Sequence, residues 1–315
     1  MLGFKQLTDK QDPLSCPIIS GEELLLWLKK GMAQKTVSEN LHLETGYRRS
    51  GGHFSPFRGS GLDYDESRLY QPGDDLRNIN WRMMARSSDI YTKIYREERE
   101  ASRLMVIDRR AAMRFGTQKT LKVTHAVEIA ACIAGLSIHQ GFSVGGMLMQ
   151  PDGLWINPER SLSKVHQWLM NAASACPPLE CGISEPELYN ILSQLQARAV
   201  AGSHIILISD FHDLNESHVP LLTRLAGHHK ILAIQVLDPV EQMLPAQGIW
   251  SINGYPQQQS VKISSDDTAI RSAYEREFQK QQQQMESIFS DCRIPFVRIR
   301  TDESFDEIPV YLSGV

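Results

Sequence analysis

The 315-residue sequence has no long uninterrupted apolar segment. No window approaches the roughly 18 apolar residues that a membrane-spanning helix needs. The N-terminus also lacks the basic region and apolar run of a signal peptide. These absences predict a cytoplasmic protein without a membrane span.

Charge of one sign and paired cysteines are also scarce. The net charge is −4 and the isoelectric point is about 6.2, so bulk electrostatics give no reason to expect nucleic acid as a partner. The five cysteines are scattered, and only Cys176 and Cys181 lie close together, without the second pair that a zinc site needs. This cysteine usage is typical of a reduced, cytosolic protein.

Residues 59–100 instead combine glycines, paired acids, spaced arginines and single aromatic residues without a helical period. Such a mixture favours short strands and tight turns, and the run from Gln71 to Asp74 is a strong turn signal. We therefore predict a small β-rich insertion over residues 41–101. Its charges are interpreted either as mutually neutralising or as ligand-binding, and they are Arg77, Arg82, Arg86, Asp63, Asp65, Asp74 and Asp75.

The segment 1–40 contains one dense apolar run, Leu24–Leu28. Ser20 and Glu23 precede it with the spacing of a capping box, which predicts a helix over about residues 21–34. So many apolar side chains on one helix face must be covered by another surface. We expect this helix either to clamp onto the main domain or to bind a partner.

Apolar runs alternate with helical patterns over residues 102–315. Strands are predicted at 104–107, 143–149, 154–156, 205–208, 231–237, 249–252, 260–263 and 296–299. Helices are predicted at 117–140, 161–175, 185–199, 219–226, 267–290 and 303–312, and the glutamine run 281–284 is interpreted as a solvated helix face. This alternation predicts an α/β fold with a doubly wound, mostly parallel sheet.

Three of the predicted strands are followed by aspartate: Asp108, Asp210 and Asp238. Ligands of doubly wound sheets bind outside the carboxyl ends of the strands. We therefore expect three carboxylates to approach one rim of the sheet.

The insertion carries a family resemblance. Its residues resemble, in order and spacing, the signature of the bacterial family called domain of unknown function 58. The matching residues are Gly59-Ser60-Gly61, Asp63-Tyr64-Asp65-Glu66, Arg68, Tyr70-Gln71-Pro72-Gly73-Asp74-Asp75, Arg77, Ile79-Asn80-Trp81 and Ala85-Arg86. Asn80 stands where the family usually has Asp. Further matches are Met113–Thr117, Ser209–Phe211, Asp238–Glu241 and Leu244-Pro245.

The resemblance implies a von Willebrand factor type A-like fold over residues 102–315. It also implies a partnership with a MoxR-type AAA+ ATPase, in a chaperone-like or maturation system that includes other type A-domain proteins. No catalytic residue is implied. The interaction candidates lie in the insertion, and they are Arg68, Tyr70, Pro72, Gly73, Asp74, Asp75, Arg77, Trp81 and Arg86.

Metal-binding type A domains hold a divalent cation with Asp-x-Ser-x-Ser after the first strand, a Thr from a second loop and an Asp from a third. Asp108 and Asp210 match the two aspartates here, but Arg110 and Ala112 replace the serines, and residues 176–188 contain no threonine. We expect the Arg110 guanidinium to replace the metal by pairing with both carboxylates, in a degenerate site without a cofactor. A magnesium ion on Asp108 and Asp210 is the disfavoured alternative, and an Arg110 side chain in solvent is another.

Three functions follow from these patterns. The preferred one is a non-enzymatic interaction module, because no nucleophile–base pair is visible. A metal-dependent hydrolase would use the three rim aspartates, but His212 is the only histidine beside these strand ends. Nucleic-acid binding would use the arginines and stacking aromatics of residues 48–81, and the balance of acids there argues against it: Arg48, Arg49, Arg58, Tyr64, Tyr70 and Trp81.

Overall fold

The computed structural model of the chain describes residues 17–33, 58–59, 63–87, 89–96, 102–117, 120–176, 184–246, 248–252 and 261–303. The chain divides into two compact units: Met1–Gly46 with Ser102–Val315, and Tyr47–Ala101. The closing helix predicted at 303–312 lies outside the described residues, except for residue 303, which belongs to a turn. Among the described residues, no helix combines the length and apolar character needed to cross a membrane.

The larger unit is built on a six-stranded sheet with the order β11-β8-β7-β4-β5-β6. Neighbouring strands are parallel except for β6, which pairs antiparallel with β5. The central strands β4 and β5 are buried along their whole length, as continuous apolar runs in parallel sheets are. The predicted mixed α/β fold with a mostly parallel sheet is therefore confirmed. The strands are β4 (Ser102–Asp108), β5 (Ser143–Met149), β6 (Trp155–Glu159), β7 (His204–Ser209), β8 (Lys230–Leu237) and β11 (Phe296–Arg300).

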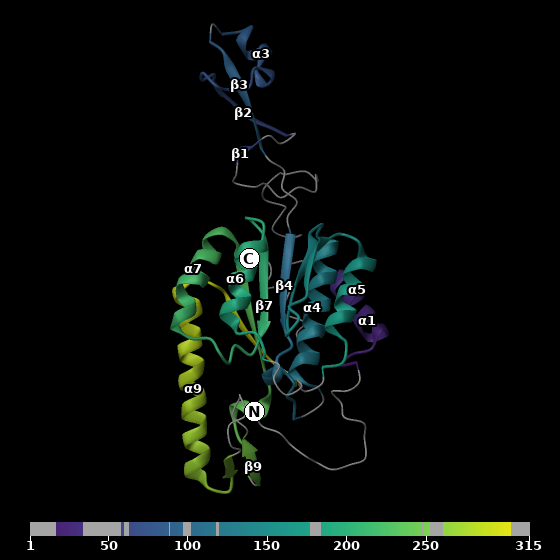
Figure 1. The fold of residues 1–315 in the computed structure, drawn as a ribbon, viewed down its shortest axis with the longest axis vertical. Helices are drawn as coiled ribbons and strands as arrows, with labels where there is room; N and C mark the ends of the chain where they lie inside the picture. Colours follow the sequence, from purple (N-terminus) through teal and green to yellow (C-terminus); the bar gives the residue numbers. More distant parts are fainter. Residues whose placement is uncertain are drawn as a thin grey trace. The chain divides into compact units, whose positions relative to one another are not determined.

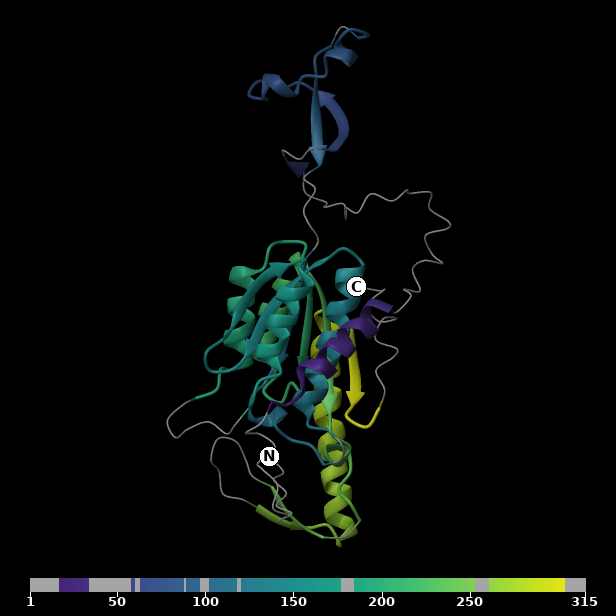
Figure 2. The same cartoon turned by 90° about the vertical axis from the view of Figure 1, so that its right-hand side faces the viewer.

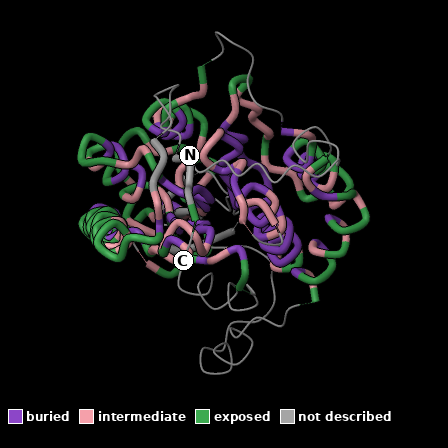
Figure 3. Tube along the Cα trace, turned by 90° about the horizontal axis from the view of Figure 1, so that it is seen from below, coloured by how far each residue is buried: buried purple, intermediate pink, exposed green. Residues whose placement is uncertain are grey.

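Helices cover both faces of this sheet (Figures 1 and 2). One face is covered by α1 (Gly21–Ala33), α4 (Lys122–His139) and α5 (Leu162–Ala172). The other is covered by α6 (Leu188–Arg198), α7 (Val219–His228) and α9 (Thr268–Asp291). Figure 3 shows the buried residues gathered in the interior and the exposed ones on the outer helices.

Helix α4 is buried because it lies between the sheet and α1. Leu24 and Leu28 of α1 are fully buried against it. The two helices approach closely at a pair of glycines. A Cβ atom on Gly31 would overlap the carbonyl oxygen of Cys132, and one on Gly135 would overlap that of Leu28.

The start of α4 differs from the prediction. The helix begins at Lys122 rather than near Thr117, and Leu121 is its N-cap. Thr117 does not cap it, because its hydroxyl and its backbone N–H both donate to the Asp238 carboxylate. The helix ends before Gly141, whose φ of 85° fits the expected stop signal.

Short elements complete the larger unit around the carboxyl ends of the strands. They are η2 (Ala111–Met113), η3 (Glu216–His218) and α8 (Pro239–Gln242). The predicted short strands are present as β9 (Ile249–Ile252) and β10 (Val261–Ser264), which form a two-stranded antiparallel sheet.

The smaller unit contains an antiparallel three-stranded sheet of β1 (Arg58–Gly59), β2 (Asp63–Leu69) and β3 (Tyr91–Arg96), in the order β1-β3-β2. The single turns η1 (Leu76–Asn78) and α3 (Trp81–Met84) lie between β2 and β3. Gly73 adopts a φ of 109° in the predicted turn. Charge pairing is present, although its partners differ in part from those predicted: Asp74 pairs with Arg68 at 2.7 Å, and Asp75 with Arg77 at 3.4 Å.

Candidate functional site

The three aspartates predicted at the sheet rim follow neighbouring strands. Asp108 ends β4, while Asp210 and Asp238 come directly after β7 and β8. All three side chains are buried. Buried carboxylates need compensating charge or hydrogen bonds, and each of the three has a different set of partners.

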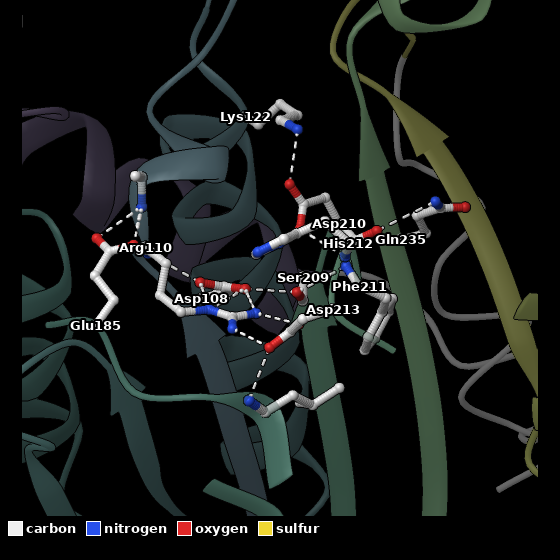
Figure 4. A network of polar contacts seen from close by, with 12 residues as sticks. Asp108, Arg110, Lys122, Glu185, Ser209, Asp210, Phe211, His212, Asp213 and Gln235 are labelled. Atoms are coloured by element: carbon white, nitrogen blue, oxygen red, sulfur yellow. Dashed lines mark hydrogen bonds and ion pairs between the residues drawn. The ribbon is translucent and has the colours of Figure 1, made fainter. Parts of the chain in front are cut away.

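Arg110 lies between two carboxylates (Figure 4). Its Nη2 atom is 2.8 Å from Asp108 Oδ2 and 3.0 Å from Asp213 Oδ1, and its backbone N–H donates to Asp108 Oδ1 at 2.9 Å. The Ser209 hydroxyl donates to Asp108 Oδ2 at 2.6 Å. The alternative of an Arg110 side chain in solvent is excluded, because the side chain is 3% exposed. The expected pairing needs one correction, because the second carboxylate is Asp213 rather than Asp210.

The two carboxylates hold Arg110 firmly in its charged form. Burial alone would lower the pKa of Arg110, but the charges and hydrogen bonds of Asp108 and Asp213 outweigh it and raise that pKa. Burial would likewise raise the pKa of Asp213, but the Arg110 guanidinium lowers it. The contacts therefore favour the charged forms of both Arg110 and Asp213.

Asp210 has another cation as its partner, which the sequence analysis did not identify. Lys122 Nζ lies 2.9 Å from Asp210 Oδ2 and 2.6 Å from Glu241 Oε1, and the side chain is 1% exposed. Burial would lower the pKa of Lys122, but the two carboxylates raise it. The sequence does contain a sign of this pair: Lys122 is the first residue of an almost entirely apolar helix. An ammonium group buried there needs an acidic partner.

His212 and Glu241 border the same lysine–aspartate pair. His212 Nδ1 lies 3.0 Å from Asp210 Oδ1. Burial would lower the pKa of His212, but the hydrogen bond and charge of Asp210 raise it above its usual value. The pKa of Glu241 is raised, because burial outweighs the opposing charge of Lys122.

Asp238 is held by hydroxyl and backbone groups. Its carboxylate accepts from the backbone N–H groups of Thr117 at 2.8 Å and Val240 at 3.0 Å, and from the Thr117 hydroxyl. Its own backbone N–H donates to Glu241 at 2.9 Å, which completes a capping box at the start of α8. Residues 176–188 contain no threonine, and the threonine that contacts a rim aspartate, Thr117, lies in the loop that precedes α4.

The remaining residue of the predicted rim is Ala112, which is half-buried in η2. The preceding residue, Ala111, donates its backbone N–H to Glu185 at 2.8 Å, and Glu185 also accepts from Arg114 at 3.0 Å. The sequence analysis missed this second buried ion pair. Glu185 thus joins the loop before α6 to the loop after β4.

The donor set suits paired charges better than a divalent cation. Among the described residues, no group of three or more His, Cys, Asp or Glu side chains is arranged as a metal site. Asp108 and Asp210, the two weak metal candidates, each have a cationic side chain within 3 Å. A divalent cation would have to displace those cations or be repelled by them.

The interaction candidates of the insertion lie in the smaller unit. Arg68 and Asp74 bind each other, and Tyr70 is half-buried. The others are exposed: Pro72, Gly73, Asp75, Arg77, Trp81 and Arg86. These residues form a set separate from the rim residues, which all belong to the larger unit.

The chain is thus an α/β protein with a mostly parallel sheet. The aspartates at the carboxyl ends of its strands are bound by Arg110, Lys122 and Thr117. Residues 66–284 match the family described as "Protein of unknown function DUF58". Because this match spans more than half of the sequence, the chain belongs to that family.

Two curated relatives have no assigned function. The chain is 28% identical over 255 residues to the uncharacterized proteins Rv1480 of Mycobacterium tuberculosis and Mb1516 of Mycobacterium bovis. Each alignment covers 81% of this chain and 80% of the relative.

Two solved structures are also similar. The conserved hypothetical protein BatB from Bacteroides thetaiotaomicron is 11% identical, with a TM-score of 0.45 over 68% of this chain and 98% of that one. An aerotolerance-related membrane protein from Bacteroides fragilis is 10% identical, with a TM-score of 0.44 over 68% of this chain and 97% of that one.

Proposed function

We propose that this chain is a non-enzymatic protein-interaction module with a von Willebrand factor type A-like domain. It works as an adaptor or co-chaperone with a MoxR-type AAA+ ATPase in the assembly or maturation of other proteins. The observation that carries this proposal is the Arg110 guanidinium between Asp108 and Asp213 at the sheet rim. A fixed guanidinium in place of a cation gives a prearranged rim that needs no metal.

The absence of catalysis is supported by how the rim carboxylates are held. A general acid or base needs a pKa near the working pH and access to substrate. Asp108 is buried between Arg110 and Ser209, and Asp210 is buried on Lys122, whose charge outweighs the effect of burial and lowers the Asp210 pKa.

The smaller unit supports the interaction part of the proposal. Trp81 is 63% exposed, and exposed tryptophans are enriched among the residues that dominate binding energy at protein interfaces. Other large apolar side chains of this unit are also exposed: Leu69, Leu76, Met83, Met84 and Ile90. A partner that covers these side chains gains the free energy of removing them from water.

The test is co-purification of the full chain with a MoxR-type AAA+ ATPase from the same organism. We expect the wild type to retain the ATPase and Trp81→Ala to weaken retention by about tenfold or more. Val200→Ala is the matched control, because Val200 is an exposed apolar residue of the other unit. Failure of the wild type to retain the ATPase contradicts the partnership. Retention as strong as that of the wild type in both Trp81→Ala and Asp74→Ala contradicts the role of the smaller unit.

Calorimetric titration with magnesium and manganese tests the metal-free rim separately. We expect no binding at micromolar strength. Micromolar binding that disappears in Asp108→Ala would show that the rim is a cation site after all.

A further inference from the structure

The helical turn α3 presents apolar and basic side chains next to one another in the smaller unit. Helical hydrogen bonding extends past its last residue, because the backbone N–H groups of residues 84, 85 and 87 each donate to the carbonyl four residues earlier, at 3.0 Å. Residues three or four positions apart on such a turn are neighbours on one face. Trp81 and Met84 are therefore neighbours, and so are Arg82 and Arg86. All four side chains are exposed.

The two arginines of this turn lack acidic partners. Among the described residues, neither guanidinium forms an ion pair or accepts a place in a hydrogen-bonded network, whereas Asp74 is bound by Arg68 and Asp75 by Arg77. Asp89 is exposed and forms no ion pair with a described residue either. The turn therefore carries positive charge that the described acids of this unit do not neutralise.

The turn is held in place by its N-cap, Asn80. The Oδ1 atom of Asn80 accepts from the backbone N–H of Met83 at 3.2 Å, and its Nδ2 donates to the Ser67 hydroxyl of β2 at 2.8 Å. Its backbone N–H donates to the Tyr91 carbonyl of β3 at 2.8 Å, and α3 lies beside that strand (Figure 1). A surface that is ordered before binding loses less conformational entropy on association. These anchors therefore favour α3 as a binding surface.

The composition of the turn favours a protein over a nucleic acid as its partner. Tryptophan, methionine and arginine are the residue types enriched at the centres of protein interfaces. Nucleic acid needs cations along its phosphates and flat rings for its bases. The exposed Asp75 and Asp89 flank α3 in the sequence and would repel phosphates, and the side chains of Met83 and Met84 have no flat ring.

We propose that α3 binds an acidic amphipathic peptide segment of another protein. The apolar side chains of that segment cover Trp81 and Met84, which gives free energy by removing them from water. Its carboxylates pair with Arg82 and Arg86, because a guanidinium matches the geometry of a carboxylate. This inference rests on the proposed role of the smaller unit in protein interaction, and it adds the chemistry of the partner.

Three synthetic peptides of equal length test the apolar and acidic requirements on the full wild-type chain. The first combines leucine and glutamate in a helical period, the second replaces the glutamates by lysines, and the third replaces the leucines by serines. We expect fluorescence anisotropy to show binding of the leucine–glutamate peptide about tenfold tighter than of either other peptide. Equal binding of either other peptide, or no binding of the first at millimolar concentration, overturns the proposal. Tighter binding of an oligothymidine strand at the same salt concentration assigns the surface to nucleic acid and also overturns it.

A reversal of charge locates the site. We expect the double variant Arg82→Glu/Arg86→Glu to prefer the leucine–lysine peptide over the leucine–glutamate peptide by about tenfold, because like charges now oppose the acidic peptide. Arg224→Glu in α7 is the control: Arg224 is an exposed arginine of the other unit, without an ion pair among the described residues, and this variant keeps the wild-type preference. A double variant that still prefers the acidic peptide overturns the assignment to α3.

A measurement on the wild type covers the case in which the double variant does not fold. The indole N–H signal of Trp81 must shift when the leucine–glutamate peptide is added, and an unmoved signal overturns the proposal. Co-purification with the ATPase is a separate result. A wild type that retains the ATPase but binds no acidic peptide overturns only this inference. A wild type that binds the acidic peptide through α3 but retains no ATPase supports this inference and contradicts only the MoxR partnership.

Discussion

The Nζ atom of Lys122 lies 2.9 Å from the Asp210 carboxylate, although 88 residues separate the two in the chain. Lys122 is the first residue of α4, and Asp210 directly follows β7. The positive end of a helix dipole disfavours a lysine at this position, so the carboxylates of Asp210 and Glu241 must compensate. The contact therefore fixes the start of α4 to the rim of the sheet.

Removal of this buried cation should be costly. We expect Lys122→Met to lower the free energy of unfolding by about 3–5 kcal/mol, because the buried Asp210 and the half-buried Glu241 lose their counter-charge. Urea denaturation monitored by circular dichroism measures the change. Lys164→Met is the control: Lys164 pairs with Glu159 at 2.6 Å but is 61% exposed, and its loss should cost less than about 1 kcal/mol. Equal costs for the two variants would contradict a structural role for the Lys122 cluster.

The Arg110 cluster gives a prediction about metal. Arg110→Ser restores one hydroxyl and leaves Asp108 and Asp213 without their shared cation. We expect millimolar Mg²⁺ to raise the melting temperature of this variant but not that of the wild type, because binding to the folded state stabilises it.

The control for this prediction is Arg114→Ser. It also removes a buried arginine, but one that is paired with the single carboxylate of Glu185. We expect Mg²⁺ to leave its melting temperature unchanged. A wild type that gains as much from Mg²⁺ as Arg110→Ser would show that the guanidinium does not stand in for a cation.

Sequence patterns predicted the layers of the fold well, because burial on both faces of a parallel sheet requires continuous apolar strands. The run 143–149, for example, is strand β5 with the same bounds. The predicted start of α4 was wrong because the true start depends on one tertiary contact. Thr117 has the chemistry of a helix cap, but its hydroxyl is used by Asp238, 121 residues away.

The sequence predicted only the part of the site that follows from the strand order. Strand ends in a parallel sheet meet at one rim, which placed Asp108, Asp210 and Asp238 together. Ion-pair partners depend on side-chain direction and burial, so the sequence could not assign Arg110 to Asp213 or Lys122 to Asp210. The same limit applies to the glutamine run 281–284, which was interpreted as a solvated face although Gln282 is buried. A polar run on a helix does not reveal which member turns inward.

Two histidines should give opposite pH dependences of stability. Asp210 raises the pKa of His212 above its unfolded value, so the stability from their contact is complete below about pH 6.5 and is lost as the pH rises through the folded pKa. We therefore expect the stability difference between wild type and His212→Gln to be largest at acidic pH. Urea denaturation across a pH series measures it.

His229 provides the opposite sign. Burial lowers its pKa, so its neutral form is favoured in the fold, and the corresponding stability is lost as the pH falls below the unfolded value. The wild type should therefore lose free energy of unfolding relative to His229→Gln only at acidic pH. An NMR titration gives both folded pKa values, and a His212 pKa at or below about 6.5 would contradict the contact with Asp210.

The close approach of α1 and α4 predicts a strict limit on side-chain size at their crossing. A Cβ atom on Gly135 would overlap the Leu28 carbonyl oxygen, so Gly135→Ala should force the helices apart and lower the free energy of unfolding by about 1–3 kcal/mol. Gly227→Ala in α7 is the control, because a Cβ built there would meet no atom within 4 Å apart from its chain neighbours and the backbone of its own helix. It should be neutral or stabilising by up to about 1 kcal/mol, since alanine is the better helix former.

Limited proteolysis separates loss of the α1 contact from general unfolding. In Gly135→Ala we expect cleavage within α1 to become faster, while the sheet core remains protected. Leu24 and Leu28 would then be exposed, and a hydrophobic dye should bind the variant more strongly than the wild type. Unchanged stability and unchanged proteolysis in Gly135→Ala would show that the packing of α1 does not depend on this crossing.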